Sequence, residues 1–223
     1  RLLAPAPSGP PHGSFRLTAL DVGQGTSVLV ETAHHVLLFD TGPGPESTYA
    51  GERVVVPYLQ AHGVNVLDTL IVSHADSDHS GGAPAVLDAI EVRQMVAALA
   101  PANALWANAR QRGAQTLPCA AGQRWQWDGV EFSMLWPDAG PLQGKPNAHC
   151  CVLRVSTLPG VVAKSGEGSG EGVGLGVTAG GVAEGGAIRQ WSVRWAADWK
   201  ARWNARRPAR RTRRRKPQAL QRC

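Results

Sequence analysis

The stretch that most constrains this chain is residues 71–82, in which two histidines and two aspartates fall within six positions. An apolar run that is typical of a buried strand comes directly before them. A pair of glycines and a helix-prone segment follow. The side chains of His74, Asp76, Asp78 and His79 are therefore predicted on a loop between a strand and a helix, a common place for functional residues.

This cluster is chemically suited to a metal ion, because imidazole and carboxylate groups are ligands of Zn, Mn or Fe. Alternate residues of an extended segment share a side, so His74 and Asp76 can face one centre while Asp78 and His79 approach it from the turn. We predict that these four residues bind one or two divalent ions, Zn or Mn, and that Asp78 is catalytic, positioning or deprotonating a water. The alternative is an exposed helix cap with two unrelated histidines, although capping needs fewer polar residues.

A further carboxylate is predicted beside this loop. Three short β-prone runs, at residues 15–20, 27–31 and 35–39, indicate a meander of strands. The third run ends at Asp40, which is followed by a turn that glycine permits. Asp40 either caps that turn or assists catalysis from beside the metal loop.

The rest of the ordered chain is predicted as helices alternating with strands. Helical spacing of apolar residues predicts helices over residues 51–63, 84–91 and 101–111, the last with Ala104, Leu105 and Ala109 facing inward. Strands are predicted over residues 67–72, 92–98 and 150–156, together with a hairpin that turns at Asp128-Gly129. The hairpin residues Trp125, Trp127 and Trp136 are able to stack on nucleobases, but we favour a place in the core, where aromatic residues of sheets are more often found.

Net charge divides the chain in two. The chain has 223 residues and a formal net charge of +6. Residues 187–223 hold 13 Lys and Arg against one acidic residue, while the remainder holds 10 against 16. Charge alone therefore predicts binding of nucleic acid only for this tail.

The sequence gives no indication of a membrane span or of a disulfide-rich fold. No apolar run reaches the roughly 18 to 20 residues that cross a bilayer, and the first residues are too few and too rich in proline for a signal peptide. The four cysteines lack Cys-x-x-Cys spacing, and two of them are adjacent. Neither a disulfide framework nor a zinc knuckle is predicted.

Four segments together resemble one family. They run from Leu20 to Gly25, from Phe39 to Gly44, from Ser73 to Gly82 and from Asn147 to Arg154. The third is similar to the metal motif of the metallo-β-lactamase fold, with Asp76 where a second histidine is more common. Combined with the Asp-Val-Gly-Gln-Gly opening, the pattern over residues 15–156 resembles the C-terminal extracytoplasmic domain of the ComEC family of competence proteins, which take up DNA.

The resemblance implies a fold, a reaction and a location. The fold class is α/β, a metallo-β-lactamase-like αββα sandwich that is incomplete in its C-terminal half. The reaction is metal-dependent nuclease or phosphodiesterase cleavage of incoming DNA, with the membrane channel portion of the parent protein as a partner and an extracytoplasmic, membrane-associated location. Asp40 supports the metal pocket in such proteins, and Asp76 in place of histidine shifts the metal preference from Zn toward Mn or Fe.

After Ser156 the resemblance fails. Similar proteins continue into a Thr-Gly-Asp segment, whose aspartate bridges the metals, and later into His-His-Gly-Ser, and neither segment occurs here. Four regions are expected: a linker at 1–14, the partial domain at 15–156, a Gly-rich flexible segment at 157–186, and a basic tail at 187–223 that is disordered or a lone helix. A frameshift or truncation in the gene explains this change, and loss of the later motifs is able to inactivate the domain.

Two other functions stay open. The same fold serves hydrolases of lactams, esters or thioesters, and the chain can also be a non-catalytic module that binds DNA or anionic lipid through its tail. In that tail a tryptophan recurs every four residues among arginines, a pattern suited to membranes or single-stranded DNA. His149 is a further candidate ligand, although a histidine at the edge of a strand more often has no chemical role.

Overall fold

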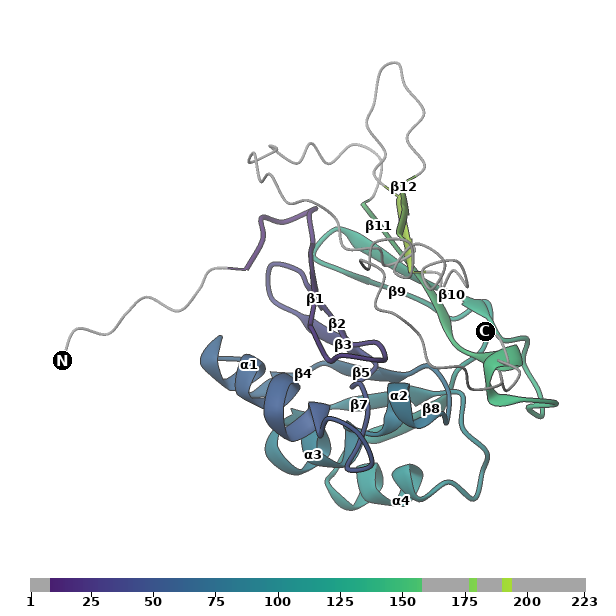
Figure 1. Cartoon of the computed structure of the whole chain (residues 1–223). Coiled ribbons are helices and arrows are strands. Elements are labelled where there is room, and N and C mark those ends of the chain that lie inside the picture. The colour runs from purple at the N-terminus through teal and green to yellow at the C-terminus, as the bar shows by residue number, and fades with distance from the viewer. Residues whose placement is uncertain (1–8, 158–176, 180–189, 194–223) are drawn as a thin grey trace, which may run out of the picture.

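The described part of the chain forms three successive layers (Figure 1). The structure is a computed structural model that describes residues 9–157 and the short strands at 177–179 and 190–193. Helices cover one face of a six-stranded sheet, and a five-stranded sheet packs on its other face. The predicted α/β class and layered sandwich are thereby confirmed, with the first helical layer and both sheets lying within the described residues.

The first sheet has a meander at one edge and parallel strands at the other. Its strand order is β1-β2-β3-β5-β7-β8. The predicted meander is confirmed as β1 (Arg16–Ala19), β2 (Val28–Glu31) and β3 (Val36–Phe39), paired antiparallel. The parallel strands are β5 (Thr69–Val72), β7 (Gln94–Ala97) and β8 (Gln115–Pro118), and β4 (Val66–Leu67) with β6 (Glu91–Val92) forms a small separate ladder.

Short helices connect the strands, and all but the last of them lie in the part of the chain that forms the first sheet. They are the π-helix η1 (Gly51–Val55), α1 (Val56–Ala61), α2 (Ser77–Ser80), α3 (Ala83–Ala89), α4 (Ala104–Gln111) and the 3-10 helix η2 (Pro146–His149). In α4 the predicted burial of Leu105 and Ala109 is confirmed, whereas that of Ala104 is wrong. Trp106 is buried in its place, because its indole Nε1 donates a hydrogen bond to the carbonyl of Ala100 at 3.0 Å.

The second sheet is built on the predicted hairpin. Its strands are β9 (Arg124–Trp127), β10 (Val130–Trp136), β11 (Val152–Thr157), β12 (Val177–Ala179) and β13 (Gln190–Val193), in the order β12-β13-β11-β10-β9. Asp128 and Gly129 have φ angles of 49° and 79°, as a tight two-residue hairpin turn requires. Trp125 and Trp127 are half-buried against the core, whereas Trp136 is 40% exposed, so its predicted place in the core is wrong.

Two strands fall where the sequence predicts a flexible segment and a disordered or helical tail. β12 lies within residues 157–186 and β13 within residues 187–223. β13 pairs antiparallel with β11, with Trp191 opposite Val155. The exposed edge of β11 has backbone groups that a further strand can pair with, which explains a strand here rather than a helix. The other predictions for the Gly-rich segment and the tail, including the frameshift, lie outside the described residues.

Alternation along the strands fills two apolar layers. On β3, Leu38 faces the helices while Leu37 and Phe39 face the second sheet. Strands buried on both faces read as continuous apolar runs, which is the pattern seen before the metal loop. The core between the sheets includes Phe132 and Leu153, both at 0% exposure.

A disulfide joins the two sheets, contrary to the prediction from cysteine spacing. It links Cys119, directly after β8, to Cys151, directly before β11, with a Cα–Cα distance of 6.1 Å. The two residues are 32 positions apart, and only the packing of one sheet on the other brings them together. Sequence spacing alone therefore does not indicate the pair.

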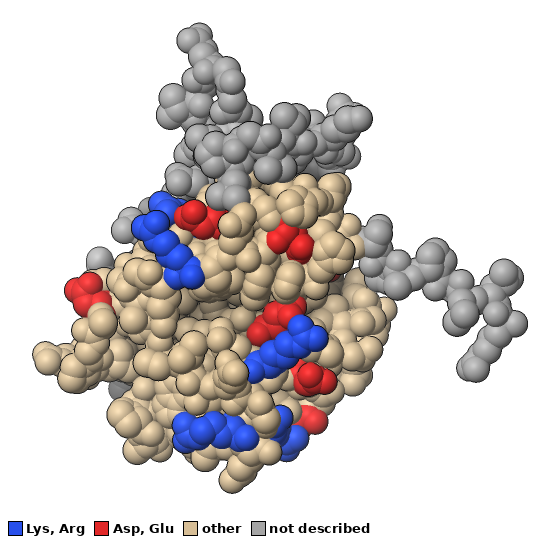
Figure 2. Space-filling model, turned by 180° about the vertical axis from the view of Figure 1, so that it is seen from behind, with Lys and Arg blue, Asp and Glu red and all other residues tan. Residues whose placement is uncertain are grey.

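No helix in the described ranges is long and apolar enough to cross a membrane. On the face shown in Figure 2, acidic and basic side chains are interspersed over a mainly uncharged surface. Among the residues described there, neither sign of charge forms a continuous patch.

Candidate metal centre

The parallel pairing of β3 and β5 brings the predicted site residues to one edge of the first sheet. Phe39 lies opposite Ile71 in this pair, so both strands end at the same level and lead into Asp40 and Ser73. The backbone N–H of Asp40 donates to the carbonyl of Ile71 at 2.8 Å. The carboxyl ends of parallel strands are where ligand sites of α/β folds gather.

The metal loop contains more regular secondary structure than the sequence predicts. Asp78 and His79 lie on α2, a single helical turn, instead of on an open turn. Asp76 occupies the N-cap position of this helix, but its side chain makes no capping hydrogen bond. The alternative of a simple polar helix cap is therefore wrong for Asp76, because its carboxylate is not used for capping.

Asp40 lies behind the histidines and holds them in place. Its carboxylate is 1% exposed and accepts hydrogen bonds from the Ser73 backbone N–H at 2.6 Å and the Ser73 hydroxyl at 2.7 Å. The same carboxylate accepts the Nδ1–H of His79 at 2.8 Å. Asp40 also has a positive φ of 59°, which is uncommon outside glycine and concentrates at functional sites.

These bonds define the tautomers of both histidines. The Ser73 hydroxyl donates its proton to Asp40 and therefore accepts from Nδ1–H of His74, which lies 3.0 Å away. His79 likewise donates Nδ1–H to Asp40. In their neutral forms both rings thus carry the lone pair on Nε2, the atom that binds a metal when Nδ1–H is held from behind.

The carboxylates of Asp76 and Asp78 lie in front of these rings. Oδ2 of Asp76 is 3.6 Å from Nε2 of His74, and Oδ2 of Asp78 is 3.8 Å from Nε2 of His79. The two imidazole centroids are 4.2 Å apart. The imidazole side chains are 3% and 6% exposed, against 41% and 33% for the two carboxylates. We call the buried Asp40, His74 and His79 the wall, and the half-exposed Asp76 and Asp78 the rim.

The wall separates the protonation of the two histidines. Burial and the neighbouring His79 lower the pKa of His74, and the surrounding carboxylates offset only part of that effect. Burial on its own would lower the pKa of His79 as well, but the hydrogen bond from its Nδ1–H to Asp40 and the charges of Asp40, Asp78 and Asp76 raise it. A metal ion that binds Nε2 of His79 therefore competes with a proton that this ring holds more tightly than a free imidazole does.

The imidazole and carboxylate groups are of the types that bind a divalent transition metal, although they lie too far apart to hold one as they stand. Within the described residues, no three His, Cys, Asp or Glu side chains are gathered closely enough to hold an ion as they stand. The rim carboxylates are at the surface and have rotamer freedom, whereas the Nε2 atoms of the wall are already oriented. The oriented imidazoles define the site, because their hydrogen bonds to Ser73 and Asp40 fix them in place.

Close backbone packing keeps the site loops together. A side chain at Gly25, which has a φ of 131°, would collide with the carbonyl oxygen of Asp78, and one at Gly81 would collide with the backbone of Gly44. The backbone N–H of Thr26 donates to that same Asp78 carbonyl at 3.1 Å. Gly25, Gly44 and Gly81 thus permit the three loops that contain them to pack closely at the candidate metal centre.

The sequence analysis missed one residue of the site, and a second residue that it left open lies apart from the site. Ser73 received no role there, yet it is the link between Asp40 and His74. Its position directly before the first histidine was the only indication. His149 is half-exposed on η2, and its Nδ1 lies 3.3 Å from the carbonyl of Gln143. No contact places His149 among the wall or rim residues.

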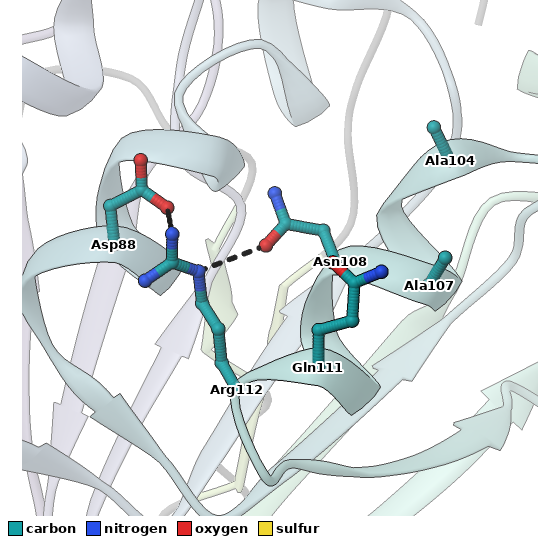
Figure 3. A pocket seen from close by; sticks show the side chains of 6 residues that line it. All are labelled: Asp88, Ala104, Ala107, Asn108, Gln111 and Arg112. Atoms are coloured by element: carbon teal, nitrogen blue, oxygen red, sulfur yellow. Dashed lines mark hydrogen bonds and ion pairs between the residues drawn. The ribbon is translucent and has the colours of Figure 1, made fainter.

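A surface cavity lies away from the wall and rim. It has a volume of about 520 Å³ and lies between α3 and α4 (Figure 3). Arg112 pairs there with Asp88 and donates from Nε to the Asn108 side chain at 3.1 Å. The lining residues are Asp88, Ala104, Ala107, Asn108, Gln111 and Arg112. The cavity shares no residue with the wall or rim and offers no imidazole or thiol ligand.

Comparison with known proteins agrees with this geometry. The profile of the Metallo-beta-lactamase superfamily matches residues 20–163. The chain belongs to this superfamily. Among curated relatives, Competence protein ComA of Neisseria gonorrhoeae is 40% identical over 149 residues, which cover 67% of this chain and 19% of that protein. Recombination protein 2 of Haemophilus influenzae is 32% identical over 154 residues, which cover 69% of this chain and 18% of that protein.

Within the superfamily, these relatives confirm the resemblance to the ComEC family. The chain spans about a fifth of the length of the curated relatives that it matches. Among solved structures, a metallo-beta-lactamase HARLDQ motif mutant of Cronobacter sakazakii is 18% identical, with a TM-score of 0.42 over 62% of this chain and 52% of that one. Because this overlap is limited, the family assignment depends on the sequence comparisons.

Proposed function

We propose that this chain contains the metal-dependent hydrolase domain of a DNA-uptake protein, and that the domain cleaves phosphodiester bonds of incoming DNA. The observation that carries the proposal is the wall, in which two buried imidazoles present Nε2 toward half-exposed carboxylates. The similarity to a competence protein and a recombination protein supports DNA as the substrate.

Each residue has a distinct part in this proposal. His74 and His79 would hold a divalent ion, Zn or Mn, through Nε2, and Asp76 and Asp78 would complete the set of ligands. A bound ion of this kind lowers the pKa of water and neutralises charge on a phosphate. Asp40 does not reach the substrate; it positions both rings, directly for His79 and through Ser73 for His74.

Asp78 is proposed as the catalytic carboxylate. It lies next to Nε2 of His79 and is one-third exposed, so it can meet both the ion and the solvent. A carboxylate at this place is able to orient the attacking water and to accept its proton. Asp40 cannot do so, because both of its oxygens are occupied behind the rings.

The test is DNA cleavage by the full chain supplied with Mn or Zn. Loss of a positioned general base costs about 10²- to 10⁴-fold in rate, so Asp78→Ala should abolish measurable cleavage without unfolding the protein. Asp88→Ala is the matched control, because Asp88 is an exposed aspartate of α3 that pairs with Arg112, away from the centre. Equal cleavage by Asp78→Ala and the unaltered chain would contradict the assignment of Asp78.

Two other outcomes would redirect the proposal. Turnover of a lactam, ester or thioester, with DNA left intact, would indicate another hydrolase of the same superfamily. Salt-sensitive DNA binding that disappears on deletion of residues 187–223, in a protein without turnover, would indicate a non-catalytic module.

A further inference from the structure

An irregularity at the end of β10 turns a tryptophan outward. Side chains of a regular strand alternate between the two faces of a sheet. The pairing of β10 with β11 instead shifts register between Met134 and Trp136. As a result Leu135 and Trp136, which are consecutive, are both exposed, at 43% and 40%. Bulges of this kind are over-represented next to active sites, where they re-aim a side chain.

The outward indole is held in one orientation. Nε1 of Trp136 donates a hydrogen bond to the carbonyl of Ala148 at 3.0 Å. The polar edge of the ring is thereby satisfied within the protein, and the ring presents apolar surface to solvent. An exposed aromatic side chain that is already ordered loses little conformational entropy when a planar ligand packs on it.

This tryptophan lies close to the candidate metal centre. Its partner across the ladder is Val152, the residue after Cys151. The backbone N–H of Cys151 donates to the carbonyl of Ser73 at 2.8 Å, and Ser73 is the residue that connects Asp40 to His74. Trp136 is therefore connected to the wall through Val152 and Cys151, two consecutive residues of the chain.

We propose that Trp136 is a stacking platform for a nucleobase of the single-stranded DNA whose phosphodiester bond lies at the wall. This inference rests on the proposed function and names the form of its substrate. A base exposes its flat face to a protein side chain in a single strand but not inside a duplex, and aromatic stacking tolerates any sequence. Lys145 is exposed and lies directly before η2, the helix that contains Ala148. It supplies a positive charge for the phosphate next to the stacked base.

Stacking is needed here because charge is weak. Residues 1–186 carry more acidic than basic side chains, and Asp138 is exposed in the loop that also holds Lys145. Electrostatic attraction to the DNA backbone is therefore small in this part of the chain. An aromatic contact provides affinity that charge does not, and salt does not screen it.

The test measures binding apart from cleavage. Anisotropy of a fluorescent oligothymidine strand is titrated with the full chain in EDTA, at about 0.2 M salt to suppress phosphate contacts made by the basic tail. Trp136→Ala should raise the Kd on the order of tenfold, and Trp136→Phe should restore most of the affinity. Leu117→Ala, which removes an equally exposed apolar side chain from β8, should leave the Kd unchanged.

A second readout separates this inference from the proposed function. An oligonucleotide built of abasic tetrahydrofuran units has phosphodiester bonds but no aromatic ring, so Trp136→Ala should cleave it as the unaltered chain does, while Asp78→Ala should not. Equal Kd values for Trp136→Ala and the unaltered chain, or no binding of the strand by the unaltered chain, would overturn the stacking role. Weaker binding by Trp136→Ala in a protein that cleaves no DNA would support stacking and overturn only the proposed hydrolysis.

Discussion

Two clusters in this protein join an aspartate to two histidines, and only one has the features of a metal centre. In the wall, Asp40 accepts Nδ1–H of His79 at 2.8 Å. In the other cluster, Asp128 accepts Nδ1–H of His34 at 2.9 Å and of His35 at 3.1 Å. Both aspartates have a positive φ, 59° and 49°. The local chemistry of the two clusters is thus nearly the same.

Their surroundings differ. The wall is buried and faces two further carboxylates, whereas the His34 side chain is 77% exposed and the carboxylate of Asp128 is fully engaged. The carboxylate of Asp128 also accepts hydrogen bonds from the Thr32 hydroxyl at 2.6 Å and the His34 backbone N–H at 2.8 Å. Asp128 therefore links the β9–β10 turn of the second sheet to the β2–β3 connection of the first sheet by hydrogen bonds. An aspartate–histidine pair becomes a candidate metal site only where Nε2 meets additional ligands in a protected place.

The same substitution at each aspartate tests this comparison, and Asp40→Asn should have the largest effect. Asparagine keeps the size of aspartate and tolerates a positive φ, but it removes the charge that holds both rings. Breaking such a buried pair costs about 3–5 kcal/mol, and loss of a partner to a metal-binding histidine weakens metal affinity about 10- to 100-fold. Thermal unfolding in chelator and calorimetric Zn titration measure the two effects.

The pH dependence of Asp40→Asn supplies a control. The pKa of His79 is raised in the folded protein, so its stabilisation is complete below about pH 6.5 and is lost as the pH rises through the folded pKa. In chelator, the difference in Tm between Asp40→Asn and the unaltered chain should therefore narrow from pH 6 toward pH 9. A constant difference would show that Asp40 acts through packing and not through His79.

Removal of the disulfide should have the next largest effect. Cys119 and Cys151 link the sheets beside the wall, since the Cys151 backbone bonds to Ser73. Replacing both by serine should cost about 2–4 kcal/mol of unfolding free energy, because the unfolded chain is no longer constrained. Urea unfolding measures this loss, and Cys150→Ser, at the adjacent half-exposed cysteine, is the control. Equal stability of the double variant and the control would contradict a disulfide that braces this end of the molecule.

Most of the wall could be predicted from sequence because its parts are local. His74 and His79 lie in one dense motif, and Asp40 ends an apolar strand, so the pattern of each segment indicates its place. Ser73 was missed because its role comes from the pairing of β3 with β5, which no single segment displays. The disulfide was missed for the same reason, since two sheets must pack before its cysteines meet.

The two wrong predictions of which side chains are buried had a different origin. Ala104 and Trp106 are both compatible with the inner side of α4, and the hydrogen bond from Trp106 to the Ala100 carbonyl selects which one is buried. The exposure of Trp136 follows from a bulge after Met134, so that continuing the alternation of Val130, Phe132 and Met134 assigns Trp136 to the wrong face. In both cases one local interaction overrides a periodic pattern.

The smallest effect is expected at the second cluster, from Asp128→Asn. Burial on its own would raise the pKa of Asp128, but hydrogen bonds from Thr32, His34 and His35 lower it well below its ordinary value. Its charge therefore contributes stability above about pH 4, and this contribution is lost as the pH falls further.

Because Asn-Gly favours the same tight turn, the substitution removes charge without changing the hairpin. The Tm should fall by about 2–4 °C at pH 7, on the order of 1 kcal/mol, and Zn affinity should not change. The Tm difference from the unaltered chain should shrink as the pH falls below about 4, because there the unfolded chain gains a proton at residue 128 while the folded protein does so only at lower pH. A loss of Zn affinity as large as that of Asp40→Asn would mean that burial and the rim carboxylates do not distinguish the two clusters.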